Sequence, residues 1–240
     1  MRAKTKHSER GGTRERLLDT AERLFAHQGF DGVGMRELAA RARVNLGAAT
    51  YHFGSKEKLY IETFLRRFRP VAAARLEMLR QHQAAAGGRP LPVPVIVECM
   101  LRAPLMTARD HPHFPPLMAR NLVMPPPCLA GVLEQEFWPS LEPCLDALGQ
   151  ALPALPRRAL MMRTMLLGGS LLMLASQLGG IRAQARAGED FLEPALRELV
   201  RFAAAGLQAA PPAHGEPEPV LPHNLPQPRA STVEENSRVL

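Results

Sequence analysis

The chain has 240 residues and a mass of 26.4 kDa, enough for one large domain or two small ones. With 46% hydrophobic and 22% charged residues, it is neither disordered nor fibrous as a whole. Its three cysteines are too few and too widely spaced for a disulfide framework or a zinc site, and the charged N-terminus leads into no apolar run. The most apolar segment, residues 166–181, is shorter than the roughly 20 residues that cross a bilayer. We therefore expect a cytoplasmic protein with no membrane partner.

Basic residues are concentrated in the first third of the chain. Residues 1–69 hold 15 Lys and Arg against 8 Asp and Glu, whereas residues 70–240 hold 15 of each kind. The whole net charge of +7 therefore lies in the N-terminal part. This distribution indicates a polyanion-binding head joined to a neutral body, although a merely soluble basic face would give the same count.

The head reads as a series of short helices. Residues 1–12 end in two glycines and predict a flexible basic arm. From Thr13, apolar residues recur at helical spacing, and Gly29 is placed to end that first helix. A second helix is expected over residues 35–42 and a third over 46–53, with Asn45 as the N-cap of the third. Ser55 is expected to cap a fourth helix that opens at Lys56.

The second and third helices, joined by a few residues, predict a helix-turn-helix arrangement. In such a unit the third helix presents its exposed N-terminal half to the major groove, which admits one α-helix. Gly47 permits a close approach to the base edges, and Thr50, Tyr51 and His52 supply hydrogen-bond donors and acceptors. This pattern predicts double-stranded DNA as the partner of the head.

The residues from Thr13 to Tyr60 resemble the N-terminal domain of the TetR family of bacterial transcriptional repressors. The resemblance rests on Leu24-Phe25-Ala26 before Gly29-Phe30, on Met35-Arg36-Glu37-Leu38-Ala39, and on Tyr51-His52-Phe53-Gly54-Ser55-Lys56-Glu57. The sequence around Val44-Asn45-Leu46 and Tyr51-His52-Phe53 is similar to that of the branch of fatty-acid-responsive regulators. The resemblance implies DNA-binding roles for eight residues: Arg36, Asn45, Leu46, Gly47, Thr50, Tyr51, His52 and Lys56.

Two positions depart from this family pattern. Gly34 stands where the family often has a Ser or Thr cap, which predicts a less firmly started second helix. Leu46 stands where Lys or Arg is common, which removes one expected phosphate contact. Among the implied roles, Lys56 would meet a phosphate, and Phe53 would belong to the core rather than to the DNA face.

The body, residues 61–210, reads as further helices. Pro70 is expected either to kink the fourth helix or to begin a new one, which Gly87-Gly88 would end. Helices are expected near 93–109, 113–124, 128–151, 156–179 and 189–208. Residues 159–178 are apolar almost all round and should be buried on more than one side, which makes the last two helices the expected dimer face. Residues 211–240 are rich in proline and predict a disordered tail.

No catalytic arrangement is convincing. Asp110, His111 and His113 stand close together, but without a further ligand a corner between two helices is the better interpretation. We therefore expect no enzymatic activity, no metal and no cofactor.

The neutral, Leu- and Met-rich body predicts a pocket for a flexible aliphatic effector, because a flat aromatic cation would favour aromatic and acidic walls. A fatty acid or its acyl-CoA thioester is favoured by the branch resemblance. Arg102, Arg109, Arg120 or Arg163 could pair with a carboxylate. The candidate ligand-binding residues are Arg102, Met106, Arg120, Met124, Met162, Met165 and Leu166.

These features together predict an all-α protein with an N-terminal helix-turn-helix domain and a C-terminal helical ligand-binding and dimerisation domain. The expected function is that of a homodimeric repressor that binds a near-palindromic operator and is released by a small apolar effector. The alternatives are a constitutive or architectural DNA-binding dimer without an effector, a multidrug-responsive repressor, and an enzyme with a DNA-binding head.

Overall fold

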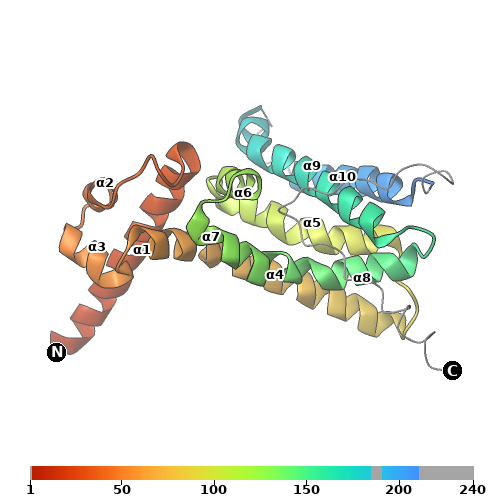
Figure 1. The fold of residues 1–240 in the computed structure, drawn as a ribbon, viewed down its shortest axis with the longest axis horizontal. Coiled ribbons are helices and arrows are strands. Elements are labelled where there is room, and N and C mark those ends of the chain that lie inside the picture. The colour runs from red at the N-terminus through yellow and green to blue at the C-terminus, as the bar shows by residue number, and fades with distance from the viewer. Residues whose placement is uncertain (1, 185–190, 211–240) are drawn as a thin grey trace, which may run out of the picture.

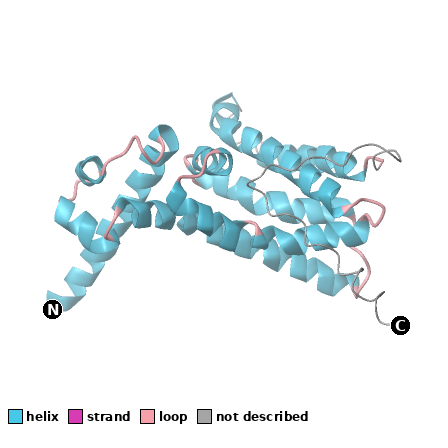
Figure 2. Ribbon diagram, viewed as in Figure 1, coloured by secondary structure: helices cyan, strands magenta, loops and turns pink. Residues whose placement is uncertain are grey.

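The computed structural model describes residues 2–184 and 191–210, and within these ranges it contains only helices and loops (Figure 2). A small head, formed by α1 to α3, lies at one end of a longer helical body, and α4 runs through both (Figure 1). The α-helices are α1 (Arg2–Gln28), α2 (Met35–Arg41), α3 (Leu46–Phe53), α4 (Lys56–Ala86), α5 (Val93–Asp110), α6 (Phe114–Val123), α7 (Pro127–Val132), α8 (Glu142–Ala151), α9 (Arg157–Gln184) and α10 (Leu192–Gln208).

The head is built around aromatic and aliphatic side chains that come from four helices. Phe25 of α1, Leu38 of α2, Phe53 of α3 and Tyr60 of α4 are all at least 97% buried in one apolar cluster. The ring of Tyr60 meets that of Phe25 edge to face, with centroids 4.7 Å apart. This shared cluster holds the helix-turn-helix pair on α1 and on the first turns of α4.

The first helix differs from the expectation. It begins at Arg2, so residues 2–12, expected as a flexible arm, continue α1. Arg, Lys and Glu are good helix formers, and each glycine in a helix costs only about 1 kcal/mol relative to alanine, so Gly11 and Gly12 do not end it. The glycine that does end α1 is the expected one, Gly29, whose φ is +75°.

The loops around α3 follow the expected capping chemistry. The Asn45 side chain accepts a 2.6 Å hydrogen bond from the backbone N–H of Ala48, and the Ser55 hydroxyl accepts one of 3.3 Å from that of Lys58. Gly34 at the start of α2 offers no side-chain cap. Consequently α3 and α4 begin with a satisfied backbone donor, whereas α2 depends on packing alone.

The fourth helix is continuous from Lys56 to Ala86, so Pro70 lies inside it. The proline is exposed, and buried Phe68 and Val71 on either side keep the helix packed although one backbone hydrogen bond is lost. Gly87 ends the helix in the left-handed conformation, with φ of 59°, as the Gly-Gly pair predicts.

The body has α5 at its centre, packed against α4, α6, α8, α9 and α10. The expected single helix over 128–151 is wrong: α7 passes into a π-helical turn at Leu133–Phe137 and a 3₁₀ turn at Pro139–Leu141 before α8 begins. Pro139 has no N–H to donate, which interrupts the α-helical hydrogen bonding there. Pro104, by contrast, lies within α5, which runs on to Asp110.

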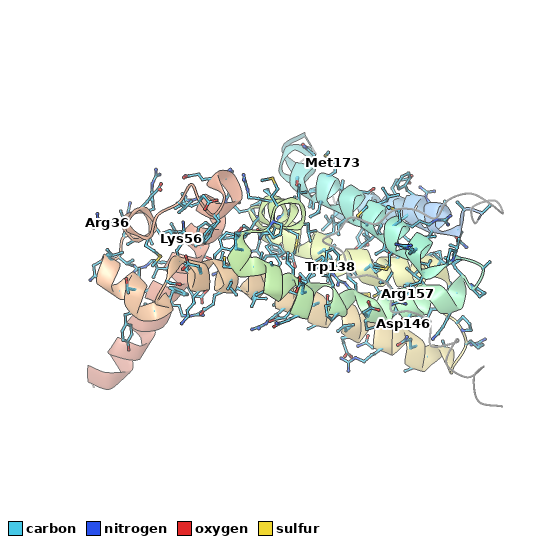
Figure 3. The ribbon with its side chains drawn as sticks, in the orientation of Figure 1. Arg36, Lys56, Trp138, Asp146, Arg157 and Met173 are labelled. Carbon is cyan, nitrogen blue, oxygen red and sulfur yellow. The ribbon has the colours of Figure 1, made fainter. Side chains whose placement is uncertain are left out.

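The ninth helix is longer and more apolar than expected. Its residues Arg157–Leu178 form a 22-residue stretch with a mean hydropathy of 1.5, long and apolar enough by length and composition to cross a membrane. It nevertheless packs against α5, α6, α8 and α10 as a core helix of the body does. Only 33% of the stretch is buried within the chain, and Met173 lies on its outer side (Figure 3). The expected tail, residues 211–240, lies outside the described residues.

Candidate functional site: a nucleic-acid interface and a body cavity

The third helix is held to the head by one face and leaves the other free of the core. Ala49 and Phe53 are buried in the head cluster. Gly47 and Thr50 are exposed, Leu46 is 39% exposed and Tyr51 is 71% exposed. The predicted groove residues at positions 45, 46, 47, 50 and 51 therefore lie together on the first turns of α3, the surface that a recognition helix presents to base edges.

His52 does not belong fully to that exposed face. Its side chain is half-buried, and its ring lies 5.5 Å from the Tyr51 ring and 6.3 Å from the Phe53 ring, measured between centroids. The imidazole therefore lies between the exposed Tyr51 ring and the buried Phe53 ring and contacts the Tyr51 ring edge to face.

Arg36 and Lys56 occupy different environments. Arg36 is exposed on α2, at the outer end of the head (Figure 3). Lys56 is half-buried, and its ammonium donates a 3.1 Å hydrogen bond to the carbonyl of Phe30 and lies 4.1 Å from the centre of the Phe30 ring. Lys56 thus fixes the loop after α1 to the start of α4, a structural contact that the sequence did not reveal.

Two arginines of the basic N-terminal third are paired with carboxylates of the same region. Arg66 on α4 makes ion pairs with Glu15, Asp19 and Glu22 of α1, and Arg67 shares Glu22 at 2.8 Å. These pairs tie α1 to α4 away from α3. Arg66 and Arg67 therefore belong to the joint between α1 and α4 rather than to the surface that carries α3.

The body contains a cavity of about 110 Å³ between α4, α5, α6, the short turns before α8, and α9. Its walls are almost entirely apolar and include three phenylalanine rings, and none of the lining residues is Asp or Glu. The lining residues are Phe68, Val71, Arg75, Met100, Leu101, Pro104, Phe114, Pro115, Met118, Leu122, Phe137, Leu141, Thr164, Leu167, Gly168, Leu171, Leu172 and Ala175.

None of the seven candidate ligand residues lines this cavity. Arg102 is bound to Glu98 and Glu193, and the Arg120 guanidinium packs over Gly29, where an added Cβ would lie 2.9 Å from it. Met124 and Leu166 are 77% and 62% exposed. Met106, Met162 and Met165 pack against the body core instead.

The other two arginines considered for a carboxylate are also engaged. Arg109 pairs with its neighbour Asp110, at 2.8 Å, and holds the pKa of that carboxyl below its usual value. Arg163 donates to the carbonyls of Leu207, Ala209 and Ala210 and so caps the end of α10. Within the described part of the chain, no three His, Cys, Asp or Glu side chains are grouped closely enough to hold a metal ion.

Two polar residues of the cavity, Arg75 and Thr164, were missed by the sequence reasoning. Arg75 is 95% buried and Thr164 is 92% buried. A signal was present in the sequence: Arg75 lies on the same stripe of α4 as Phe68, Val71 and Leu79, and the other buried residues of α4 beyond Thr63 are apolar. A charged residue on such a stripe marks a polar requirement in the core.

The sixth helix joins the cavity to the head. Its residues Phe114, Met118 and Leu122 line the cavity, and the helix also packs on α1. The Tyr60 hydroxyl donates a buried 2.5 Å hydrogen bond to the Asn121 side-chain oxygen, which connects α4 in the head to α6. A displacement of α6 by a molecule in the cavity would therefore act directly on the helices that carry α3.

A capped, exposed third helix on a small basic head, beside an all-helical body with its own cavity, defines a helix-turn-helix DNA-binding regulator. Residues 17–63 match the family described as bacterial regulatory proteins, tetR family, and residues 98–206 match the tetracyclin repressor-like C-terminal domain. The chain belongs to the TetR family of transcriptional regulators, whose members act by binding DNA rather than by catalysis.

Curated relatives are similar to this chain mainly over the head. The transcriptional regulator AcrR of Shigella flexneri is 37% identical over 93 residues, 39% of this chain and 41% of AcrR. The repressor NemR of Escherichia coli K12 is 46% identical over 52 residues, 22% of this chain and 26% of NemR. The matched part of the chain thus spans 41% of the length of AcrR and 26% of that of NemR.

Solved structures share the fold over most of the chain. A mutant of HlyIIR is similar with a TM-score of 0.56 at 20% identity, and the match covers 84% of this chain and 100% of the HlyIIR chain. A TetR-like regulator from Rhodococcus sp. RHA1 is similar with a TM-score of 0.56 at 19% identity, and the match covers 82% of this chain and 97% of the Rhodococcus chain. At this level of identity the likeness concerns the fold alone.

Proposed function

We propose that this protein is a repressor that binds a near-palindromic operator as a homodimer and leaves it when a small molecule occupies the body cavity. The observation that carries the proposal is the connection between its two sites. The helix that forms one wall of the cavity, α6, also packs on α1. A ligand that favours a displaced α6 would therefore favour a displaced head.

The DNA part of the proposal assigns base contacts to the exposed face of α3. Tyr51, with Thr50 and Gly47, would enter the major groove, while Arg36 would contact the backbone from α2 and Asn45 would hold the start of α3 in place. His52 and Leu46 would complete the surface that meets the groove. Lys56, at the N-terminus of α4, would keep its contact with Phe30 and direct a remaining N–H at a phosphate.

A second copy of the chain is the proposed cover for the apolar outer faces of α9 and α10. Leu166 and Met173 on α9 and Phe202 on α10 are each more than 60% exposed. Gly169 on α9 is exposed, and an added Cβ there would meet nothing within 4 Å, so a partner helix has room to approach closely. Two heads related by a two-fold axis would read half-sites about one helical turn, roughly 34 Å, apart.

The experiment that tests the DNA proposal is selection of duplexes from a random pool by the full-length protein, followed by footprinting. The expected result is an inverted repeat protected over two successive major grooves. Enrichment of a single unrepeated site, or of no sequence at all, would contradict the proposal.

Dimerisation is tested separately by sedimentation of two variants. Phe202→Glu should convert the dimer to monomer, because it places a charge in the proposed apolar interface. Met124→Glu, an equally exposed apolar residue on another surface, is the matched control and should remain dimeric. If both variants sediment as the wild type does, α10 is not the interface.

The cavity favours an effector over the constitutive alternative and disfavours a cationic drug. A pre-formed apolar hollow of this kind can hold a ligand, whereas a purely architectural protein has no use for one. A cation would find no carboxylate among the lining residues to replace its hydration. The volume of about 110 Å³ is also too small for an acyl-CoA thioester unless the walls move.

A further inference from the structure

Arg75 is a buried cation whose partner is absent from the described protein. Its Nη1 donates a 3.3 Å hydrogen bond to the hydroxyl of Ser140, and its Nε is buried with no hydrogen-bond partner. No ion pair links it to any Asp or Glu whose side chain the structure describes, in residues 12–178 and 191–210. The ionisable group that interacts with it electrostatically is the Cys144 thiol, and burial raises the pKa of that thiol to about 11, so it is neutral at pH 7.

A second unsatisfied polar group lines the same cavity. The hydroxyl oxygen of Thr164 is buried and has no hydrogen-bond partner in the described structure. Arg75 comes from α4 and Thr164 from α9, yet both border a space whose other walls are apolar. Native proteins seldom leave buried polar groups unpaired, because each costs about 1–3 kcal/mol and a charged group more.

The two polar groups lie at the end of the cavity away from the head. Along α4, Arg75 is two helical turns, roughly 10 Å, further from the head than Phe68. On α9, which returns from α8 towards α6 and the head, Thr164 precedes the other lining residues (Figure 1). Phe114, Met118 and Leu122 of α6 form the apolar wall nearest the head.

From this arrangement we propose that the effector is a monocarboxylate with a compact apolar body, whose carboxylate binds Arg75 and Thr164. This inference rests on the proposed effector function and names the chemical class of its ligand. The Nε and an Nη of a guanidinium match the two oxygens of a carboxylate, and the Thr164 hydroxyl donates to one of them. The apolar part then points along the cavity to α6.

The size of the cavity limits the ligand. A buried space of about 150 Å³ accepts a benzene ring, so 110 Å³ suits a short aliphatic acid without movement of the walls, and an aromatic ring requires a small expansion. A longer chain reaches α6 and must displace it. Hexanoate, octanoate and benzoate are therefore the probes, and hexanol, octanol and benzyl alcohol are their uncharged counterparts.

The test is calorimetric titration of the full-length protein, without DNA, by each probe. The acids should bind wild-type protein at least tenfold more tightly than the corresponding alcohols. Arg75→Met should lose that preference while it retains the weak binding of the alcohols. Arg102→Met removes an arginine of the same body that is already paired with two glutamates, and it should bind the acids as the wild type does.

The stability of the unliganded variants provides an independent readout. Arg75→Met removes an uncompensated buried charge, so the variant should melt at or above the wild-type temperature. If Arg75 had a structural partner in the protein, its removal would leave that partner unpaired and the melting temperature would fall. Arg75→Lys keeps a charge but not the planar fork and should bind the acids less tightly than wild type. Arg75→Lys therefore replaces Arg75→Met in the binding test if the methionine variant does not fold.

The outcomes separate the site from the function. Equal binding of acids by wild type and Arg75→Met, or equal binding of acids and alcohols by wild type, overturns the carboxylate site. Binding that needs Arg75 but never releases DNA supports the site and overturns its role as the effector site. Release of DNA by compounds that bind independently of Arg75 supports the proposed function and overturns this inference.

Discussion

Replacement of Arg43 by glycine should stabilise the protein, although it removes the whole side chain. Arg43 follows α2 in the turn before α3, and its φ of 55° makes it the one residue other than glycine with a positive φ among those described. Its N–H donates to the Ala40 carbonyl at 3.1 Å, and that of Val44 donates to Ala39 at 2.9 Å. This pair of bonds defines a Schellman motif, in which Arg43 occupies the position that usually holds glycine.

The size of the effect follows from two opposing terms. A left-handed conformation costs an L-residue about 1–2 kcal/mol, which glycine does not pay. Glycine in turn loses about 0.5–1 kcal/mol more backbone entropy on folding. Arg43 is exposed, so little packing is lost with its side chain. The net expectation is a gain of about 0.5–1 kcal/mol, or an increase in Tm of roughly 1–4 °C for a chain of this length.

The assay is thermal and urea unfolding at one fixed protein concentration, since a dimer melts at a temperature that depends on concentration. Arg43→Ala removes the same side chain but keeps the unfavourable φ, and it should not share the gain. Arg41→Gly, two residues earlier and inside α2, should instead destabilise by about 0.5–1 kcal/mol. If Arg43→Gly is no more stable than Arg43→Ala, the strain argument is refuted.

Three further predictions concern the head. Tyr51→Ala should weaken operator binding by about 5- to 150-fold and leave binding to random duplex nearly unchanged in gel-shift titrations, because base contacts carry the sequence information; equal losses on both would exclude a base contact. Lys56→Ala should lower the unfolding free energy by about 1 kcal/mol through loss of the Phe30 contacts. If the ammonium meets a phosphate, the variant should also reduce the slope of log K for DNA binding against log salt concentration by roughly one. Lys58→Ala is the control of equal charge, and an unchanged slope would leave Lys56 a purely structural residue. Burial raises the pKa of Tyr60 from 10.0 to about 12, so the folded state keeps the proton that the unfolded state loses, and stability should fall as the pH rises from 10 to 12. Tyr60→Phe should show a smaller fall in unfolding free energy over this pH range in urea titrations. An identical pH dependence in the two proteins would show that the Tyr60 hydroxyl does not cause the fall.

Local chemistry allowed the head to be predicted from the sequence almost residue by residue. Two helices begin at a side-chain cap, which Asn45 and Ser55 provide, and two end at a glycine with positive φ, Gly29 and Gly87. Each of these signals acts through contacts within a few residues. Such short-range signals do not depend on the rest of the fold. The helix-turn-helix unit and the two helix boundaries around α3 could therefore be predicted from the amino-acid sequence alone.

The residues that line the body cavity could not be predicted in the same way, because they depend on which helices meet in space. Arg102 and Arg120 are as basic as Arg75 in the sequence, but the structure pairs one with glutamates and packs the other over Gly29. The flexible arm failed for another reason: two glycines cost a helix less than the surrounding residues contribute. Composition, likewise, did not show that the few aromatic residues of the body would gather around one cavity.

The unbroken course of α4 makes it a rigid lever with the two sites on its opposite arms. Lys56 and Arg75 are 19 residues apart on this helix, which corresponds to roughly 28 Å along its axis. A tilt of only about 6° at the cavity would move the other arm by about 3 Å, the length of one hydrogen bond to a base edge. Pro70, with its missing backbone hydrogen bond, lies between the two arms and is the point where such a lever bends most easily. In the proposed mechanism, the response of the DNA-binding head to a ligand in the cavity therefore depends partly on the stiffness of the exposed turn around Pro70.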